Sequence, residues 1–195
     1  MTVRHVIWTN LDGPGMEHLK LTSGEEGYLA DGMYVGRDDE TVPYRLHYEI
    51  RVDPTWQMRS LVLRLMDGPN GSSETALTVD ERCAWRNAAG ESIPALEGCH
   101  EVDFFATPFT NTLPIRRLGL AAGESAEISV AYIDGPGLEL RPVRQRYHCI
   151  RPAGPDSGLY RYEALFRAGS PIEIEVDSDG LVIDYPGSFE RVWAG

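Results

Sequence analysis

Apolar and polar residues alternate along most of this chain, and this period of two is typical of half-buried β-strands. The clearest example is the segment 42–52, where every second residue is apolar and most residues between them are charged. The segment 55–67 follows, with Leu61, Leu63 and Leu65 on one predicted face. The other predicted face is also apolar and carries Trp56, Met58, Val62 and Met66. We therefore expect this second strand to be covered on both sides.

Further segments with strand character continue to the end of the chain. They are 3–9, 16–21, 28–35, 75–80, 83–87, 126–133, 138–149, 159–166, 172–176, 181–185 and 189–193. Glycine-containing turns separate many of them, and the short spacing leaves no room for crossover helices, so neighbours should pair antiparallel. About a dozen strands exceed what a flat sheet holds, which favours a sheet that rolls up.

One segment lacks the alternation and predicts the single helix of the fold, between about residues 110 and 122. Thr112 can cap this helix, and Pro114 then falls in its first turn, where the missing N–H is harmless. Ile115 and Leu118 supply apolar contacts. Because a lone, mostly apolar helix needs cover, we predict a mainly β fold in which a long antiparallel sheet of roughly a dozen or more strands is rolled around a single α-helix.

Composition narrows the class of protein. A chain of 195 residues predicts one domain, residues 1–195, and its formal net charge of −12 argues against a nucleic-acid partner and against docking on anionic membranes. We expect no stable membrane insertion, because no apolar run is long enough to span a bilayer. The odd set of Cys83, Cys99 and Cys149, with no signal peptide before it, predicts free thiols and a cytoplasmic location.

Several runs of residues resemble one known family. They are Gly98-Cys99, Val102-Asp103, the run TPFTNTLPIRRL at 107–118, LYRYE at 159–163, and Asp179-Gly180-Leu181-Val182 with Asp184-Tyr185-Pro186. Together they resemble the family described as "putative glycolipid-binding", and the resemblance covers essentially the whole chain.

This resemblance implies a spiral β-roll in a protein that forms homodimers. Two classes of protein have a similar shape. One comprises the carriers that shuttle outer-membrane lipoproteins, and the other comprises mycobacterial lipoproteins that hold lipids. The functional name of the family rests on this similarity of shape, so the resemblance transfers no catalytic residue.

Arg116 and Arg117 are the sharpest polar feature of the signature. They lie about 100° apart on a helix, so at most one can face the interior fully. One guanidinium could hold an anionic or sugar head group at the mouth of a cavity. The alternative is that both interact with the helix C-terminus or with nearby carboxylates.

The other candidate ligand-binding residues are polar or aromatic residues near the helix and the helix residues themselves. They are Tyr48, Trp56, Asp103, Phe109, Asn111, Ile115 and Leu118. The aromatic residues suit sugars and acyl chains, but they equally suit an ordinary β core. Asn111 can bond sugar hydroxyls or help to cap the helix. His100 and Asp103 point to opposite faces of a strand, so we expect no metal site and no cofactor.

The sequence favours a non-enzymatic binding or carrier protein for a lipid or glycolipid, held between the rolled sheet and the helix. Acyl chains would gain about 0.8 kcal/mol for each CH₂ group that leaves water. An alternative is an enzyme that acts on a carbohydrate or lipid intermediate with carboxylates such as Asp103 or Asp184. A third possibility is a dimeric scaffold whose roll is filled by its own side chains. The sequence offers no recognisable catalytic motif.

Overall fold

The computed structural model describes residues 1–37, 42–135 and 137–195. These residues form fourteen strands, one α-helix and one 3-10 helix. In chain order the elements are β1 (Thr2–Asn10), β2 (Gly15–Gly24), β3 (Gly27–Arg37), β4 (Pro43–Val52), β5 (Met58–Gly68), β6 (Gly71–Val79), β7 (Trp85–Asn87), η1 (Pro94–Leu96), β8 (Glu101–Phe104), α1 (Phe109–Leu118), β9 (Ser125–Asp134), β10 (Glu139–Arg151), β11 (Gly158–Ala164), β12 (Ile172–Val176), β13 (Val182–Tyr185) and β14 (Phe189–Ala194). The prediction of a mainly β chain with a single α-helix is confirmed.

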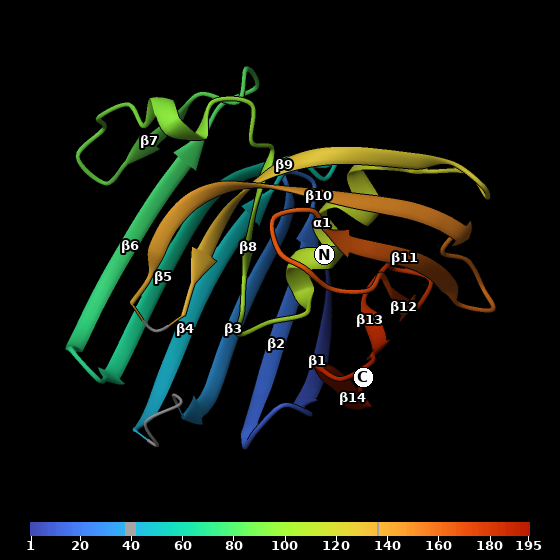
Figure 1. The fold of residues 1–195 in the computed structure, drawn as a ribbon, viewed down its shortest axis with the longest axis horizontal. Helices are drawn as coiled ribbons and strands as arrows, with labels where there is room; N and C mark the ends of the chain where they lie inside the picture. Colours follow the sequence, from blue (N-terminus) through green and yellow to red (C-terminus); the bar gives the residue numbers. More distant parts are fainter. Residues whose placement is uncertain (38–41, 136) are drawn as a thin grey trace.

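All fourteen strands belong to one sheet, in the order β7-β6-β5-β4-β3-β2-β1-β14-β13-β12-β11-β10-β9-β8. The first and last strands of the chain, β1 and β14, are therefore neighbours in the middle of the sheet. Figure 1 shows how the sheet rolls, so that β9 and β10 pass across the helix opposite β1 to β4. The sheet does not close on itself, because β7 and β8 form its two edges.

One strand pair departs from the antiparallel pattern that the sequence predicts. β8 and β9 pair in parallel, with Glu101 opposite Val130 and Phe104 opposite Ile133. Helix α1 lies between these two strands in the chain, and a parallel pair needs a crossover of this kind. The antiparallel expectation is correct for the other pairs described and wrong at the one place where the chain contains a helix.

Helix α1 is shorter than predicted and begins earlier. The Thr107 hydroxyl accepts a hydrogen bond from the Phe109 backbone N–H at 3.0 Å, so Thr107 satisfies the first turn in place of Thr112. Thr112 is instead buried within the helix and donates to the Gly180 carbonyl at 2.8 Å. Gly119, with φ of 55°, ends the helix in the left-handed conformation that glycine adopts easily. Because the helix begins at Phe109, Pro114 lies inside it and not in its first turn.

The alternation in β4 places the residues as the sequence predicts, whereas that in β5 does so only in part. The even-numbered residues of β4 from Tyr44 to Val52 are buried, and Leu61, Leu63 and Leu65 of β5 pack beside them. Met58 is also buried, because an irregularity in the β4–β5 pairing next to Val52 shifts its phase. Trp56 is buried as well, but it lies in the turn before β5, with φ of 64°.

The outer face of β5 is only partly covered. Val62 and Met66, which the sequence assigns to a covered face, are half-buried. The expectation of full cover on both faces of this strand is therefore wrong. Cys83, Cys99 and Cys149 carry free thiols, as predicted.

Candidate functional site

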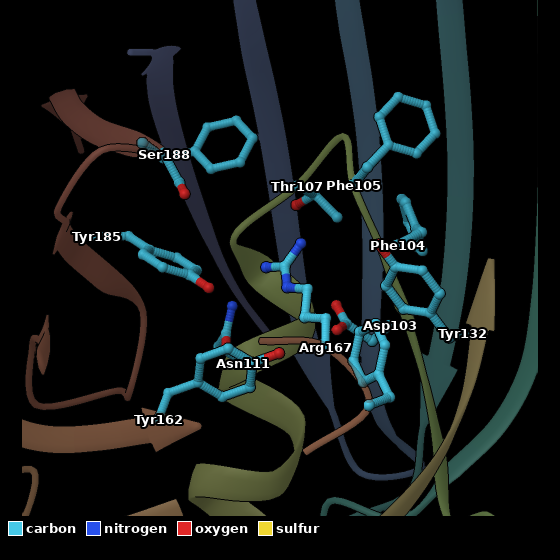
Figure 2. A pocket seen from close by; sticks show the side chains of 12 residues that line it. Asp103, Phe104, Phe105, Thr107, Asn111, Tyr132, Tyr162, Arg167, Tyr185 and Ser188 are labelled. Carbon is cyan, nitrogen blue, oxygen red and sulfur yellow. The ribbon is translucent and has the colours of Figure 1, made fainter. Parts of the chain in front are cut away.

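A cavity of about 150 Å³ lies between the start of helix α1 and the strands that roll over it. Its lining comes from β8, the β8–α1 connection, α1, β9, β11, the β11–β12 loop, β13 and β14. The lining residues are Asp103, Phe104, Phe105, Thr107, Asn111, Tyr132, Tyr162, Phe166, Arg167, Tyr185, Ser188 and Phe189. Figure 2 shows that these side chains surround a common space. Rolling the sheet brings segments that are far apart within residues 103–189 to one site.

Asp103 is the carboxylate in this lining. Its Oδ1 accepts a hydrogen bond from the Thr110 hydroxyl at 2.7 Å, and its Oδ2 accepts one from the Gln145 side-chain amide at 2.6 Å. Burial raises the pKa of Asp103, and these two hydrogen bonds oppose the rise. The neighbours hold the carboxyl group in a fixed orientation at the cavity wall.

Asn111 is held equally firmly from within the helix. Its Oδ1 accepts a hydrogen bond from the Tyr147 hydroxyl at 2.8 Å, and its Nδ2 donates to the Pro108 carbonyl at 3.3 Å. The side chain is therefore held in one orientation at the cavity wall by β10, which carries Tyr147, and by the residue before helix α1.

Aromatic rings form much of the remaining wall. The rings of Tyr162 and Tyr185 meet edge to face with centroids 6.1 Å apart, and Tyr132 lies 5.1 Å from the ring of Phe166. Burial raises the pKa values of Tyr132, Tyr162 and Tyr185, so all three phenols keep their protons at neutral pH. The cavity is thus aromatic on its sides and carries neutral hydroxyl groups.

A second hollow of about 310 Å³ adjoins the cavity and shares two of its residues, Tyr162 and Arg167. The other residues that line it are Ala164, Ala168, Gly169, Ser170 and Ile172. We call this hollow the outer groove. It is formed by the end of β11, the β11–β12 loop and the start of β12, and apart from Tyr162 and Arg167 its side chains are small or apolar.

Behind the cavity lies a buried acid that sequence analysis missed. Glu17 on β2 is fully buried and accepts hydrogen bonds from the Tyr48 hydroxyl and, at 2.7 Å, from the Thr107 hydroxyl. Burial raises its pKa to about 8, against the effect of these hydrogen bonds. Its other oxygen, Oε2, has no hydrogen-bond partner among the described residues. Glu17 shares an inner strand face with Leu19 and Leu21. The alternation in the sequence could therefore have identified it as an acidic residue at a buried strand position.

The nine candidate ligand-binding residues predicted from the sequence do not lie together in the structure. Asp103 and Asn111 line the cavity. Phe109 and Ile115 are buried in the hydrophobic core, and Tyr48 is buried against Glu17. These three side chains are not among the lining residues, although Tyr48 reaches the lining residue Thr107 at 3.2 Å.

The two arginines of the signature are occupied elsewhere. Arg117 forms a two-pronged ion pair with the buried carboxylate of Glu101, with both N–O distances at 2.8 Å. Arg116 lies over the ring of Trp56, with 5.1 Å between the guanidinium carbon and the ring centroid, and donates to the Ser178 carbonyl at 3.3 Å. For Arg117 the structure therefore shows pairing with a carboxylate, the alternative that the sequence left open.

Leu118 and Arg117 line a different hollow of about 470 Å³, together with His100 and Arg144. Arg117 is paired with Glu101, and Arg144 is paired with Glu127. Because both cations already have carboxylate partners, this hollow offers a ligand fewer unpaired charged groups than the cavity beside Asp103.

Neither a metal site nor a spanning helix is found in the part of the chain that the structure describes. No three His, Cys, Asp or Glu side chains in residues 1–37, 42–135 and 137–195 are grouped so that they could hold a metal ion. No helix within these residues has the length and apolar character needed to cross a bilayer.

Comparison with known proteins finds a family model and several solved structures. The family model described as "Putative glycolipid-binding" matches residues 5–191. The chain is 38% identical to a DUF1089 family protein from Pseudomonas aeruginosa, with a TM-score of 0.83 over 91% of this chain and 92% of that chain. A β-barrel-like protein of the domain of unknown function DUF1849 from Brucella abortus is 12% identical, with a TM-score of 0.57 over 100% and 97%. This second likeness concerns the fold alone. No curated protein matches the chain.

Proposed function

The chain belongs to the family described as "Putative glycolipid-binding", and on that premise we propose that the protein binds an amphiphile with a sugar head group. The observation that carries the proposal is the cavity between helix and sheet, with the outer groove beside it. The head group occupies the cavity, and the apolar tail follows the outer groove.

The size and lining of the cavity suit one ring. A cavity of about 150 Å³ is large enough to hold one six-membered ring, since apolar protein cavities of about this volume bind benzene. Tyr162, Tyr185 and Phe189 offer flat faces for a sugar ring, and Asp103 and Asn111 offer fixed polar atoms for its hydroxyl groups. The cavity is too small for two acyl chains, which is why we assign the head group to it.

The outer groove suits the tail. Ala164, Ala168 and Ile172 give it an apolar wall directly beside the cavity residue Tyr162. Each CH₂ group that moves from water onto such a wall contributes up to about 0.8 kcal/mol. An amphiphile therefore gains from both hollows, whereas a free sugar or a free alcohol gains from one.

The lining favours binding over sugar hydrolysis. Most glycosidases place two carboxyl groups on either side of the scissile bond. Among the described residues that line the cavity, Asp103 is the only carboxylate. A binding role needs no second acid.

Calorimetric titration with octyl β-glucoside below its micelle concentration tests this proposal. Wild type should bind it more tightly than either glucose or octanol. Ala168→Trp should block the outer groove and weaken binding at least tenfold, because Ala168 lines that groove. Ala89→Trp is the matched control, since Ala89 is exposed on a turn outside both hollows. Absence of binding to wild type would contradict the proposal.

We also propose that the protein is a homodimer, since the family resemblance implies dimers and apolar side chains lie on the outer face of the sheet. Met16 and Val35 are cross-strand partners on β2 and β3, and each is about half exposed. Trp193 on β14 is 52% exposed opposite Ile7 of β1. Pairing this face with a second copy removes these side chains from water.

A cytoplasmic location is the remaining part of the proposal. It is supported by Cys83, whose free thiol is partly exposed, because such a thiol persists in a reducing compartment. Cell fractionation with an antibody against the protein tests it.

A further inference from the structure

Arg167 stands at the boundary between the cavity and the outer groove. It lies in the loop between β11 and β12 and lines both hollows. Figure 2 shows its guanidinium near the middle of the cavity, with the rings of Tyr132, Tyr162 and Tyr185 around it. Any ligand that extends from one hollow into the other must pass this cation.

The guanidinium is not neutralised by an ion pair. Among the described residues, no carboxylate lies within ion-pair distance of Arg167, and none forms a hydrogen bond with its side chain. Its guanidinium carbon lies 5.7 Å from the centroid of the Phe166 ring. The neighbouring strand arginines differ, since Arg146 pairs with Glu163 and Arg161 pairs with Glu173. Arg167 therefore retains five N–H donors and a full charge for a ligand.

The hydroxyl groups around Arg167 are also unused. No described residue forms a hydrogen bond with the phenol oxygens of Tyr132, Tyr162 or Tyr185, although Tyr162 and Tyr185 are less than a tenth exposed. In Figure 2 these hydroxyls turn toward the cavity. Protonated phenols that face an unpaired cation offer further donors, and a ligand rich in acceptor oxygens satisfies all of them.

Asp103 interacts electrostatically with Arg167, which lowers the pKa of Asp103 against the effect of burial, but the two side chains are not within ion-pair distance. Both of its oxygens already accept hydrogen bonds, from Thr110 and Gln145, on the side of the cavity wall. Arg167 is exposed, so solvent covers its charge when no ligand is bound. An anionic group on a ligand would supply the direct ion-pair partner that this side chain lacks.

We propose that the head group bound by this protein is an acidic saccharide, a sugar ring that carries a carboxylate or a phosphate. This inference rests on the proposed binding of a sugar-headed amphiphile and names its chemical class. The anionic group contacts Arg167 and the tyrosine hydroxyls, the ring lies among the aromatic side chains, and the tail leaves past Arg167 through the outer groove.

The test compares amphiphiles that differ only in the head group. Octyl β-glucoside and octyl β-glucuronide share ring and tail, and the second carries a carboxylate in place of CH₂OH. Calorimetry on wild type should give at least tenfold tighter binding of the glucuronide, the range expected for a hydrogen bond to a charged group. Octyl β-glucoside 6-phosphate distinguishes the two anions, because whichever of them the cavity prefers binds more tightly.

Variants assign the preference to Arg167. Arg167→Gln should abolish the preference, so that octyl β-glucoside and octyl β-glucuronide bind with about equal affinity, while Arg167→Lys should retain part of the preference, since it keeps the charge without the planar fork. Arg161→Gln is the matched control, because Arg161 is exposed on β11 and pairs with Glu173. Thermal melts of each variant verify that the fold is intact.

The outcomes separate the two proposals. Equal binding of the neutral and acidic amphiphiles by wild type overturns the acidic head group and leaves the proposed function in place. A preference that survives in Arg167→Gln overturns the role of Arg167. No binding of any of the three amphiphiles overturns both proposals.

Discussion

The carboxyl group of Glu17 links the stability of the protein to pH. Burial raises its pKa from 4.5 to about 8, so between these values the folded chain keeps a proton that the unfolded chain releases. The contribution of Glu17 to the free energy of unfolding is therefore fully present below pH 4.5. It falls by about 1.4 kcal/mol per pH unit above that value and is lost once the pH exceeds about 8.

Glu17→Gln should remove this dependence. The glutamine carbonyl can still accept from Tyr48 and Thr107, and no buried charge forms at high pH. We expect the variant to be more stable than wild type by a few kcal/mol, on the order of 3, at pH 9, with a smaller difference at pH 5. Urea denaturation at pH 5, 7 and 9 measures this, with the exposed Glu25→Gln as control. If the free energy of unfolding changes with pH in the same way in wild type and in Glu17→Gln, Glu17 is not the group that causes the pH dependence.

At the scale of the element, helix α1 determines where the cavity residues lie. Its start fixes Asn111, and its end at Gly119 allows the chain to turn back into β9. Thr107 serves both the helix, through the Phe109 N–H, and Glu17 of the opposite sheet layer. The first turn of the helix is therefore attached to the sheet at the position where the cavity begins.

Gly119→Ala tests the end of this helix. Its φ of 55° suits glycine, and a side chain there strains the backbone without meeting any neighbour within 4 Å. We expect a loss of about 1 kcal/mol in the free energy of unfolding, seen as a lower melting temperature. Gly154→Ala is the control, because Gly154 has no positive φ and its nearest neighbour would lie 3.9 Å from the new Cβ. Equal melting temperatures for the two variants would refute this account of the helix end.

At the scale of the whole molecule, the outer face of β14, β1, β2 and β3 predicts self-association. Sedimentation velocity at micromolar concentration should find a dimer for wild type. Met16→Glu should shift it toward monomer, since it places a charge beside Val35 in the proposed interface. Thr78→Glu is the control, because Thr78 is exposed on β6 outside that face. A monomeric wild type would remove the support for a dimer.

The limits of sequence analysis are clearest at particular residues. The alternation of apolar residues located the strands, but it could not reveal the irregularity next to Val52 that places Met58 in the core. The signature run placed Arg116 and Arg117 on the helix correctly, yet their partners Trp56 and Glu101 depend on tertiary contacts. Arg167 lies in a loop of small residues and gave no pattern at all.

The sequence by itself determined a mainly β chain, one helix near its middle and a sheet too long to stay flat. These properties follow from local physics, because strand alternation, glycine turns and helix periodicity each depend on residues a few positions apart. The run at 107–118 also located the segment around which the sheet rolls.

Only the tertiary structure decided which residues share the cavity. Asp103, Tyr132 and Arg167 come from β8, β9 and the β11–β12 loop, and they meet because the sheet curls over the helix. Whether an inward tyrosine packs in the core or faces a cavity depends on the distance between two layers of that roll. No short stretch of sequence contains that distance, since it results from packing the whole sheet around α1.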